Sequence, residues 1–136
     1  MTLPGWRDVE LEEAWIDGDR SARWSSSAIH GSGSGAATSG SSAIEIEPGS
    51  RLPHHTDSAE EVVVVISGAA LVAISGDEHR LAAGGIAVIP EGVPHEVHNV
   101  AEDPLRFAAI YAAADVTSTY EAEVQPEGSR TRRAVA

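Results

Sequence analysis

Apolar residues between positions 41 and 113 either alternate with polar ones or form short runs, and both patterns predict β-strands. Ile44 and Ile46 alternate with polar neighbours, and the β-branched run at 62–66 is too short for a typical helix. Similar segments follow at 70–74, 86–89, 95–100 and 105–112. No long amphipathic helix is evident, although residues 8–16 are spaced loosely enough for one or two helical turns.

Turn-forming sequences separate these segments at intervals of about 8–12 residues. They are Pro48-Gly49, Ser67-Gly68, Gly76-Asp77-Glu78, Gly84-Gly85 and Asp103-Pro104. Short strands divided in this way predict an all-β fold, either a sandwich or a barrel.

Three parts are expected along the chain. Residues 1–40 form an N-terminal arm and a Gly/Ser-rich loop that packs on the barrel, residues 41–114 form the barrel core, and residues 115–136 form a C-terminal tail or arm. The stretch GSGSGAATSGSS at 31–42 has the composition of a flexible linker, although its second half could be an edge strand. The three tryptophans, Trp6, Trp15 and Trp24, are expected to cover an opening or an edge of the barrel.

Composition narrows the function classes. The 136 residues suit one domain, and the absence of cysteine excludes disulfides, thiolate ligands and a cysteine nucleophile, which fits a cytoplasmic protein. Nine basic against 21 acidic residues give a formal charge of −12, so no nucleic-acid partner is expected. No apolar run approaches the roughly 20 residues of a membrane span, and the acidic N-terminus is unlike a signal peptide, so no membrane partner is expected.

Two segments combine histidine with turn residues and an apolar run: GSRLPHHTDSAEEVVVVISG at 49–68 and GGIAVIPEGVPHEVHN at 84–99. Together they resemble the two motifs of the cupin superfamily. The second segment matches its pattern at every position: Gly84, Pro90, Gly92, His95 and Asn99.

The first segment matches in outline, through Gly49, Glu61 and Gly68. The compact spacing between the segments is similar to that of small single-domain bacterial cupins. The resemblance implies a double-stranded β-helix, or jelly-roll barrel, and most such proteins are homodimers. Because that fold carries many activities, it leaves the reaction open.

Cupin metal ligands are usually two histidines in an H-x-H pair, a glutamate and the histidine of the second motif. The resemblance assigns the last two places to Glu61 and His95, which are also the candidate catalytic residues. The H-x-H pair is broken here, since the chain reads His54-His55-Thr56-Asp57.

Two registers are therefore open, because residues two apart on a strand share a face. In one register His54 is the first ligand and Thr56 takes the second place, and Pro53 favours this arrangement. In the other, His55 and Asp57 take these places, which gives the fuller ligand set. Adjacent histidines both face inward only at a bulge. His54, His55, Asp57, Glu61 and His95 are thus the candidate metal ligands.

These residues suit a divalent transition metal: iron, manganese, nickel or zinc. By the same alternation Val63 and Val65 share the face of Glu61, Val97 shares that of His95, and His98 faces away. We expect a metal-dependent enzyme of the dioxygenase, isomerase, cyclase or lyase type that acts on a small organic substrate. The alternatives are a metal-free sensor or carrier of a small ligand, and a metal-free cyclase or isomerase that uses His and Glu as acid–base groups.

Overall fold

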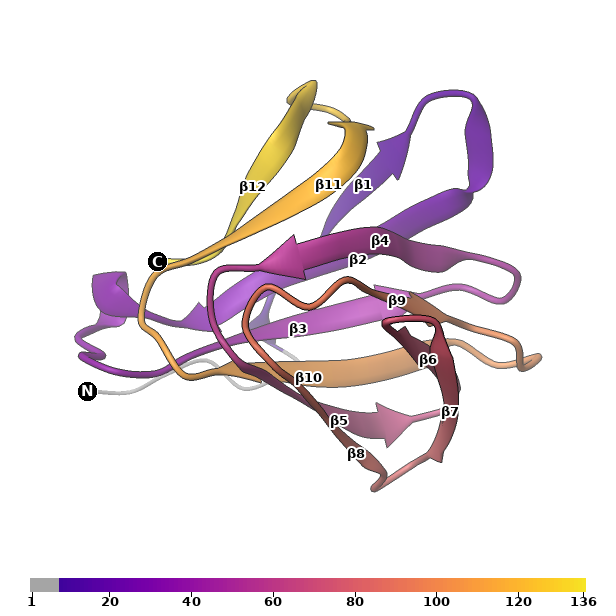
Figure 1. Cartoon of the computed structure of the whole chain (residues 1–136), viewed down its shortest axis with the longest axis horizontal. Helices are drawn as coiled ribbons and strands as arrows, with labels where there is room; N and C mark the ends of the chain where they lie inside the picture. The colour runs from indigo at the N-terminus through magenta and orange to yellow at the C-terminus, as the bar shows by residue number, and fades with distance from the viewer. Residues whose placement is uncertain (1–7) are drawn as a thin grey trace.

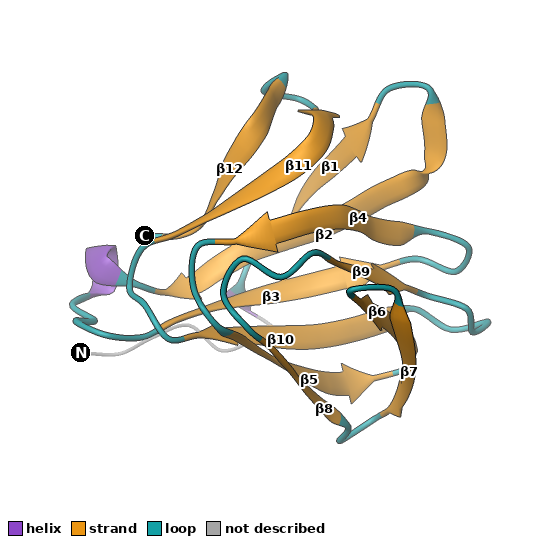
Figure 2. Cartoon of the chain, viewed as in Figure 1, coloured by secondary structure: helices purple, strands orange, loops and turns teal. Residues whose placement is uncertain are grey.

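The computed structural model describes residues 8–136, and almost all of its regular structure is β-strand (Figure 1, Figure 2). The first half contains β1 (Glu12–Ile16), β2 (Asp19–His30), the short 3-10 helix η2 (Ser32–Ser34), β3 (Gly40–Ile46), β4 (Arg51–Asp57) and β5 (Glu61–Ser67). The second half contains β6 (Ala69–Ile74), β7 (Asp77–Ala82), β8 (Ile86–Ile89), β9 (His95–His98), β10 (Leu105–Tyr111), β11 (Val116–Val124) and β12 (Ser129–Val135). In residues 8–136 there is no helix long and apolar enough to span a membrane.

The strands form two facing halves of a nearly closed barrel. One half has the order β1-β2-β3-β10-β5-β8, and the other has the order β12-β11-β4-β9-β6-β7. Within residues 8–136 a single parallel pairing, Ala22 with Arg51, joins β2 to β4 and links the halves. All other pairings are antiparallel, as expected where strands are connected by turns rather than crossover helices. The all-β jelly-roll fold expected from the sequence is confirmed.

Small and medium apolar side chains fill the space between the two halves. Strand β5 alternates buried and less buried residues, with Val63 and Val65 inside, and Val97 of β9 and Phe107 of β10 face them from neighbouring strands. The alternation predicted for Val63, Val65 and Val97 is therefore observed. Trp24 of β2 is also buried in this core, whereas Trp6 lies outside the described residues.

The barrel is longer than the 41–114 core expected from the sequence. Residues 12–30 form β1 and β2 and not helical turns, and residues 116–135, expected as a tail or an arm, form the β11–β12 hairpin. Strand β11 alternates regularly between buried and exposed residues, but one of its inward positions is Ser118. A polar residue at an inward position hides the apolar periodicity by which a strand is recognised in a sequence.

The Gly/Ser-rich segment is divided between two kinds of structure. Ser32–Ser34 form η2, and from Gly40 the chain is β3, which lies between β2 and β10 and is not an edge strand. Gly40 is required because a side chain there would lie 2.6 Å from Val135 Cγ2 and 2.8 Å from the Ala113 carbonyl oxygen. Composition alone does not reveal such tight packing against the C-terminal strand.

Two motif residues hold turns of the fold and have no chemical task. Gly68 has φ +84°, and an added Cβ would lie 2.6 Å from the Pro104 carbonyl oxygen, so only glycine fits. The buried Asn99 side chain donates from Nδ2 to the carbonyl oxygens of Ile46 (2.8 Å) and Asp103 (2.9 Å), and its Oδ1 accepts from the Ala101 amide at 3.0 Å. The intact second segment therefore specifies the fold as well as a histidine.

Candidate metal centre

Four buried donor side chains meet at one end of the barrel: His55, Asp57, Glu61 and His95. His55 and Asp57 lie at the end of β4, Glu61 is the first residue of β5, and His95 is the first residue of β9. The β4–β9 register pairs His55 directly with His95. Each residue offers one ligand atom, and these atoms all lie within 4.8 Å of one another.

Backbone carbonyls orient both histidines. His55 Nδ1 lies 2.7 Å from the Pro53 oxygen, and His95 Nδ1 lies 2.9 Å from the Val93 oxygen, so each Nδ1–H donates to a carbonyl. The Nε2 atoms are consequently left facing the carboxylates. Histidines that bind metals usually have their second nitrogen held in this way, because it fixes the tautomer and the ring direction.

The two carboxylates approach His95 from different strands. His95 Nε2 lies 3.1 Å from Glu61 Oε1 and 3.2 Å from Asp57 Oδ2. Asp57 Oδ1 accepts a hydrogen bond from Ser118 Oγ of β11, whereas the buried Oδ2 has no aligned hydrogen-bond partner among residues 8–136. Oδ2 faces His95 Nε2 at 3.2 Å and His55 Nε2 at 3.7 Å, and these imidazoles offset the cost of burying it.

Burial and mutual contact shift the pKa of all four groups. Burial lowers the pKa of His55 to about 4 and raises that of Glu61 to about 7. Burial also opposes charge on Asp57 and His95, but their contact outweighs it and, with the help of the other neighbours, lowers the Asp57 pKa to about 2 and raises the His95 pKa to about 10. His95 is thus an imidazolium between the carboxylates, and neutral His55 presents its Nε2 lone pair to the cluster.

His54 is not brought to this cluster, so the register that would make it a ligand is wrong for the structure. Its side chain is 37% exposed, and its Nδ1 lies 3.0 Å from Glu121 Oε1 on β11. The pairing of β4 with β9 is irregular between Leu52 and His55. Proline has no N–H for the strand ladder, and Pro53 lies within this irregularity, so Leu52 and His55 both face inward although they are three residues apart.

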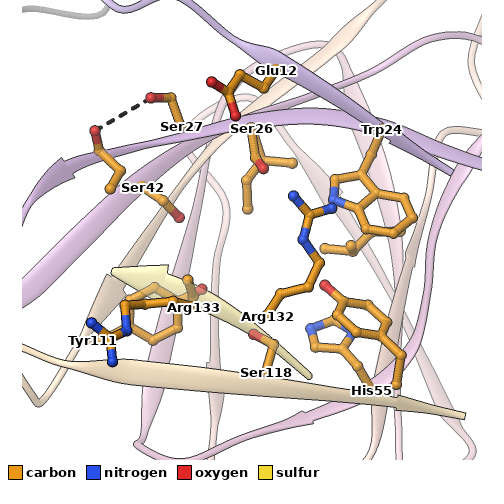
Figure 3. A pocket seen from close by; sticks show the side chains of 15 residues that line it. Glu12, Trp24, Ser26, Ser27, Ser42, His55, Tyr111, Ser118, Arg132 and Arg133 are labelled. Carbon is orange, nitrogen blue, oxygen red and sulfur yellow. Dashed lines mark hydrogen bonds between the residues drawn. The ribbon is translucent and has the colours of Figure 1, made fainter. Parts of the chain in front are cut away.

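A cavity of about 190 Å³ adjoins the cluster (Figure 3). It lies between the β1–β2–β3 side of the barrel and the β11–β12 hairpin, and His55 is the member of the cluster that lines it. Among the lining residues that the sequence did not single out are Ser118, Tyr120 and Arg132, all on the hairpin. Residues 115–136 resemble a tail in composition, and no motif spacing connects them to the cluster. His98, expected to face away, is partly exposed and lies 2.8 Å from Glu96.

The donor set and its geometry fit a divalent transition metal. Two imidazole nitrogens and two carboxylates are the ligands found in mononuclear iron, manganese, nickel and zinc sites. Ligand atoms bound at about 2.1 Å lie at most about 4.2 Å apart, so a small closure of this cluster would bring every donor within bonding distance. A cation would also satisfy Asp57 Oδ2 and displace the proton from His95 Nε2.

The model of a family described as "Cupin domain" matches residues 42–111. The chain therefore belongs to the cupin superfamily. It is 33% identical over 63 residues to an uncharacterized protein of Streptomyces coelicolor, a match that covers 46% of this chain and 56% of the relative. The chain thus spans little more than half of that protein.

Solved structures agree with the fold. They include the cupin domain of Cnp3 from Schizosaccharomyces pombe (TM-score 0.65, 13% identity, 80% of this chain and 72% of that one). Bacillus subtilis oxalate decarboxylase, in a study of its Mn(II) centers, has a TM-score of 0.59 and 21% identity over 74% of this chain and 28% of that one. A putative sugar phosphate isomerase of Acidithiobacillus ferrooxidans has a TM-score of 0.58 and 23% identity over 75% and 67% of the two chains. At these identities the likeness is one of fold.

Proposed function

We propose that this protein is a metal-dependent cupin enzyme that acts on a small organic molecule. The observation that carries the proposal is the cluster of His55, Asp57, Glu61 and His95, in which two oriented imidazoles and two carboxylates converge in a buried site next to a cavity. A merely structural role would not require four ionisable side chains at the same place, since burying charges without a task is costly.

Within this proposal the four side chains are the metal ligands, and His54 is left out. When bound, the metal supplies Lewis-acid polarisation of a substrate carbonyl or enolate. Pro53 and Val93 hold the imidazoles through their carbonyls, and Ser118 holds Asp57. The apolar side chains of Val63 and Val65 exclude water behind Glu61. The Mn(II) centers of the Bacillus subtilis neighbour make manganese a natural first choice to test, along with iron, nickel and zinc.

Metal uptake tests the site with a matched pair of variants. Protein purified without a histidine tag is assayed for bound metal before and after incubation with each of the four ions. His55→Ala should lose uptake, whereas His54→Ala, which removes the neighbouring exposed imidazole, should bind as the wild type does. Equal uptake by both variants, or greater loss in His54→Ala, would overturn the assignment of the ligands.

The enzyme assignment needs a separate test, because a metal site can also serve a sensor. Metal-loaded protein is incubated with small carboxylic acids, including oxalate, and with sugar phosphates, the compounds suggested by the names of the neighbours. Product formation is followed by NMR and oxygen consumption by an electrode. Turnover that is lost in His55→Ala supports the proposal, and binding without turnover across the set would favour a sensor or carrier.

The contact between His95 and Glu61 supports a second candidate, a metal-free cyclase or isomerase. Their 3.1 Å separation lets the pair exchange a proton, which acid–base catalysis requires. In that case turnover would persist in a strong chelator and would be lost in Glu61→Gln. If the enzyme is metal-dependent, as proposed above, turnover should stop in the chelator.

We also propose that the chain forms a homodimer. The outer face of β5, β8 and β10 carries exposed branched apolar side chains, and Val62 pairs with Val88 while Val64 pairs with Ile86, so the face is continuous. Its most exposed members are Ile66, Ile86, Val88 and Ile110. Large exposed apolar patches usually mark interaction sites. Light scattering should give the mass of a dimer for the wild type and that of a monomer for Val88→Lys. A monomeric wild type would contradict this proposal.

The cytoplasmic location stays a prediction.

A further inference from the structure

The C-terminal hairpin contributes a guanidinium to the cavity beside the metal centre. Arg132 of β12 lines the same cavity as His55. Its side chain is only 17% exposed, and its Cζ lies 5.9 Å from the centroid of the Trp24 ring. Figure 3 shows this side chain reaching toward Trp24, with its guanidinium beside the indole ring. Arg132 is thus part of the pocket and not of the outer surface.

One nitrogen of this guanidinium has no partner. Nη1 of Arg132 is buried and makes no hydrogen bond to any residue in 8–136. Nη2 lies 3.4 Å from Glu127 Oε1, a long contact to a side chain that is 54% exposed. Buried donors are nearly always satisfied by protein, water or a ligand, because leaving one unpaired costs free energy. Nη1 therefore still lacks an acceptor, and the cavity that Arg132 lines is where an acceptor group could reach this side chain.

The rest of the cavity wall is rich in hydrogen-bond donors. Burial raises the pKa of both Tyr111 and Tyr120, so their phenols stay protonated and can donate. Glu12 is the one carboxylate among the residues that line the cavity. Six of these residues carry a hydroxyl group: Ser26, Ser27, Ser42, Tyr111, Ser118 and Tyr120.

Positive charge is concentrated at this hairpin in an otherwise acidic protein. Three of the nine basic residues of the chain, Arg130, Arg132 and Arg133, lie on β12, although the formal net charge is −12. Arg133 also lines the cavity and has no ion-pair partner in the described part of the chain. A local positive patch on an acidic surface attracts anions to its own position.

We propose that Arg132 binds the carboxylate group of a small organic substrate, which then lies between this guanidinium and the metal centre. The planar guanidinium donates two parallel hydrogen bonds to a carboxylate, a match that lysine does not offer. At about 190 Å³ the cavity is smaller than the roughly 300–1,000 Å³ of sites for drug-sized ligands, so the acid has only a few carbon atoms. The inference rests on the proposed function, since it takes this cavity as the substrate site.

Titration with propionate and succinate, each compared with its neutral amide, tests the inference on the full-length protein. Binding is followed through the backbone amide NMR signals of Ser118 and Arg132. The acids should shift these signals in a saturable way, and the amides should not. Arg132→Gln should weaken acid binding about tenfold to a hundredfold, the value of a hydrogen bond to a charged group. Arg130→Gln, which removes an exposed arginine of the same strand, should leave it unchanged.

Three results would overturn the inference: equal binding of acid and amide, unchanged acid binding in Arg132→Gln, or tighter binding of inorganic phosphate at the same signals. Arg132→Lys keeps the charge and guards against a folding defect in Arg132→Gln, and it should bind the acids with intermediate affinity. Metal uptake is measured on the same samples and should be unchanged in Arg132→Gln. A wild-type protein that takes up no metal would refute the proposed function. A wild-type protein that takes up metal but binds acid and amide equally would refute only this inference.

Discussion

Ser118 provides the sharpest test of how the cluster is held together, because it touches Asp57 from a strand outside the family motifs. Its hydroxyl donates to Asp57 Oδ1, which leaves Oδ2 directed at His95. Both side chains are almost fully buried, and the Ser118 hydroxyl is the donor that fixes Asp57 Oδ1. Loss of a group that orients a metal ligand typically lowers metal affinity 10- to 100-fold, which corresponds to about 1.4–2.7 kcal/mol.

Ser118→Ala should therefore weaken Mn(II) binding 10- to 100-fold. The affinity is measured at pH 7 by a titration in which EPR reports the concentration of free Mn(II). The same hydrogen bond helps to lower the Asp57 pKa to about 2, so its loss raises that pKa. A moderate rise still leaves Asp57 ionised at pH 7, so the weakening reflects orientation and not protonation. Thr119→Ala, at the next and exposed position of β11, is the matched control and should bind as the wild type does. Affinities for Ser118→Ala within about threefold of wild type would refute the reasoning.

Two further predictions concern stability. Asn99→Ala removes three side-chain hydrogen bonds, among them the buried one to the Ile46 carbonyl, so urea unfolding should show a loss of about 2–4 kcal/mol in the free energy of unfolding with metal uptake intact. A loss below about 1 kcal/mol would contradict the structural role of Asn99. The pKa of His55 falls from 6.5 to about 4 on folding, because burial disfavours the charged imidazole. The contribution of neutral His55 to the free energy of unfolding is therefore fully present above pH 6.5 and is lost as the pH falls towards 4. In chelator, wild type should lose about 3 kcal/mol relative to His55→Gln over that range, and parallel curves would show that His55 is not buried as a neutral group.

Much of the fold was predictable because its signals are local. The short β-branched run of β5 and the intact second segment, with Gly84 and His95 at motif spacing, predicted the strands and the jelly roll. The period of two also placed His55 and Asp57 on one face. The choice between His54 and His55 could not be made locally, since it depends on the irregular pairing around Pro53, where β4 meets β9.

The missed residues share one cause: their importance depends on contacts between distant parts of the chain. Ser118 lies 61 residues from Asp57 in sequence, and Arg132 meets Trp24 across the barrel. Strand β12 carries exposed arginines and only one fully buried residue, Val135, so its composition resembles that of a solvated tail. Pairing with β11 and closure over the cavity make it part of the barrel, and neither leaves a pattern in the sequence of β12 itself.

The central claim is that one metal ion is held by the four clustered side chains, and anomalous diffraction tests it most directly. Crystals of untagged protein loaded with manganese or zinc are measured on both sides of the absorption edge of the metal. We expect an anomalous peak at about 2.0–2.2 Å from Nε2 of His55 and Nε2 of His95, with Asp57 and Glu61 as oxygen ligands. A peak beside His54 and Glu121, or loaded crystals with no peak among the four side chains, would contradict it.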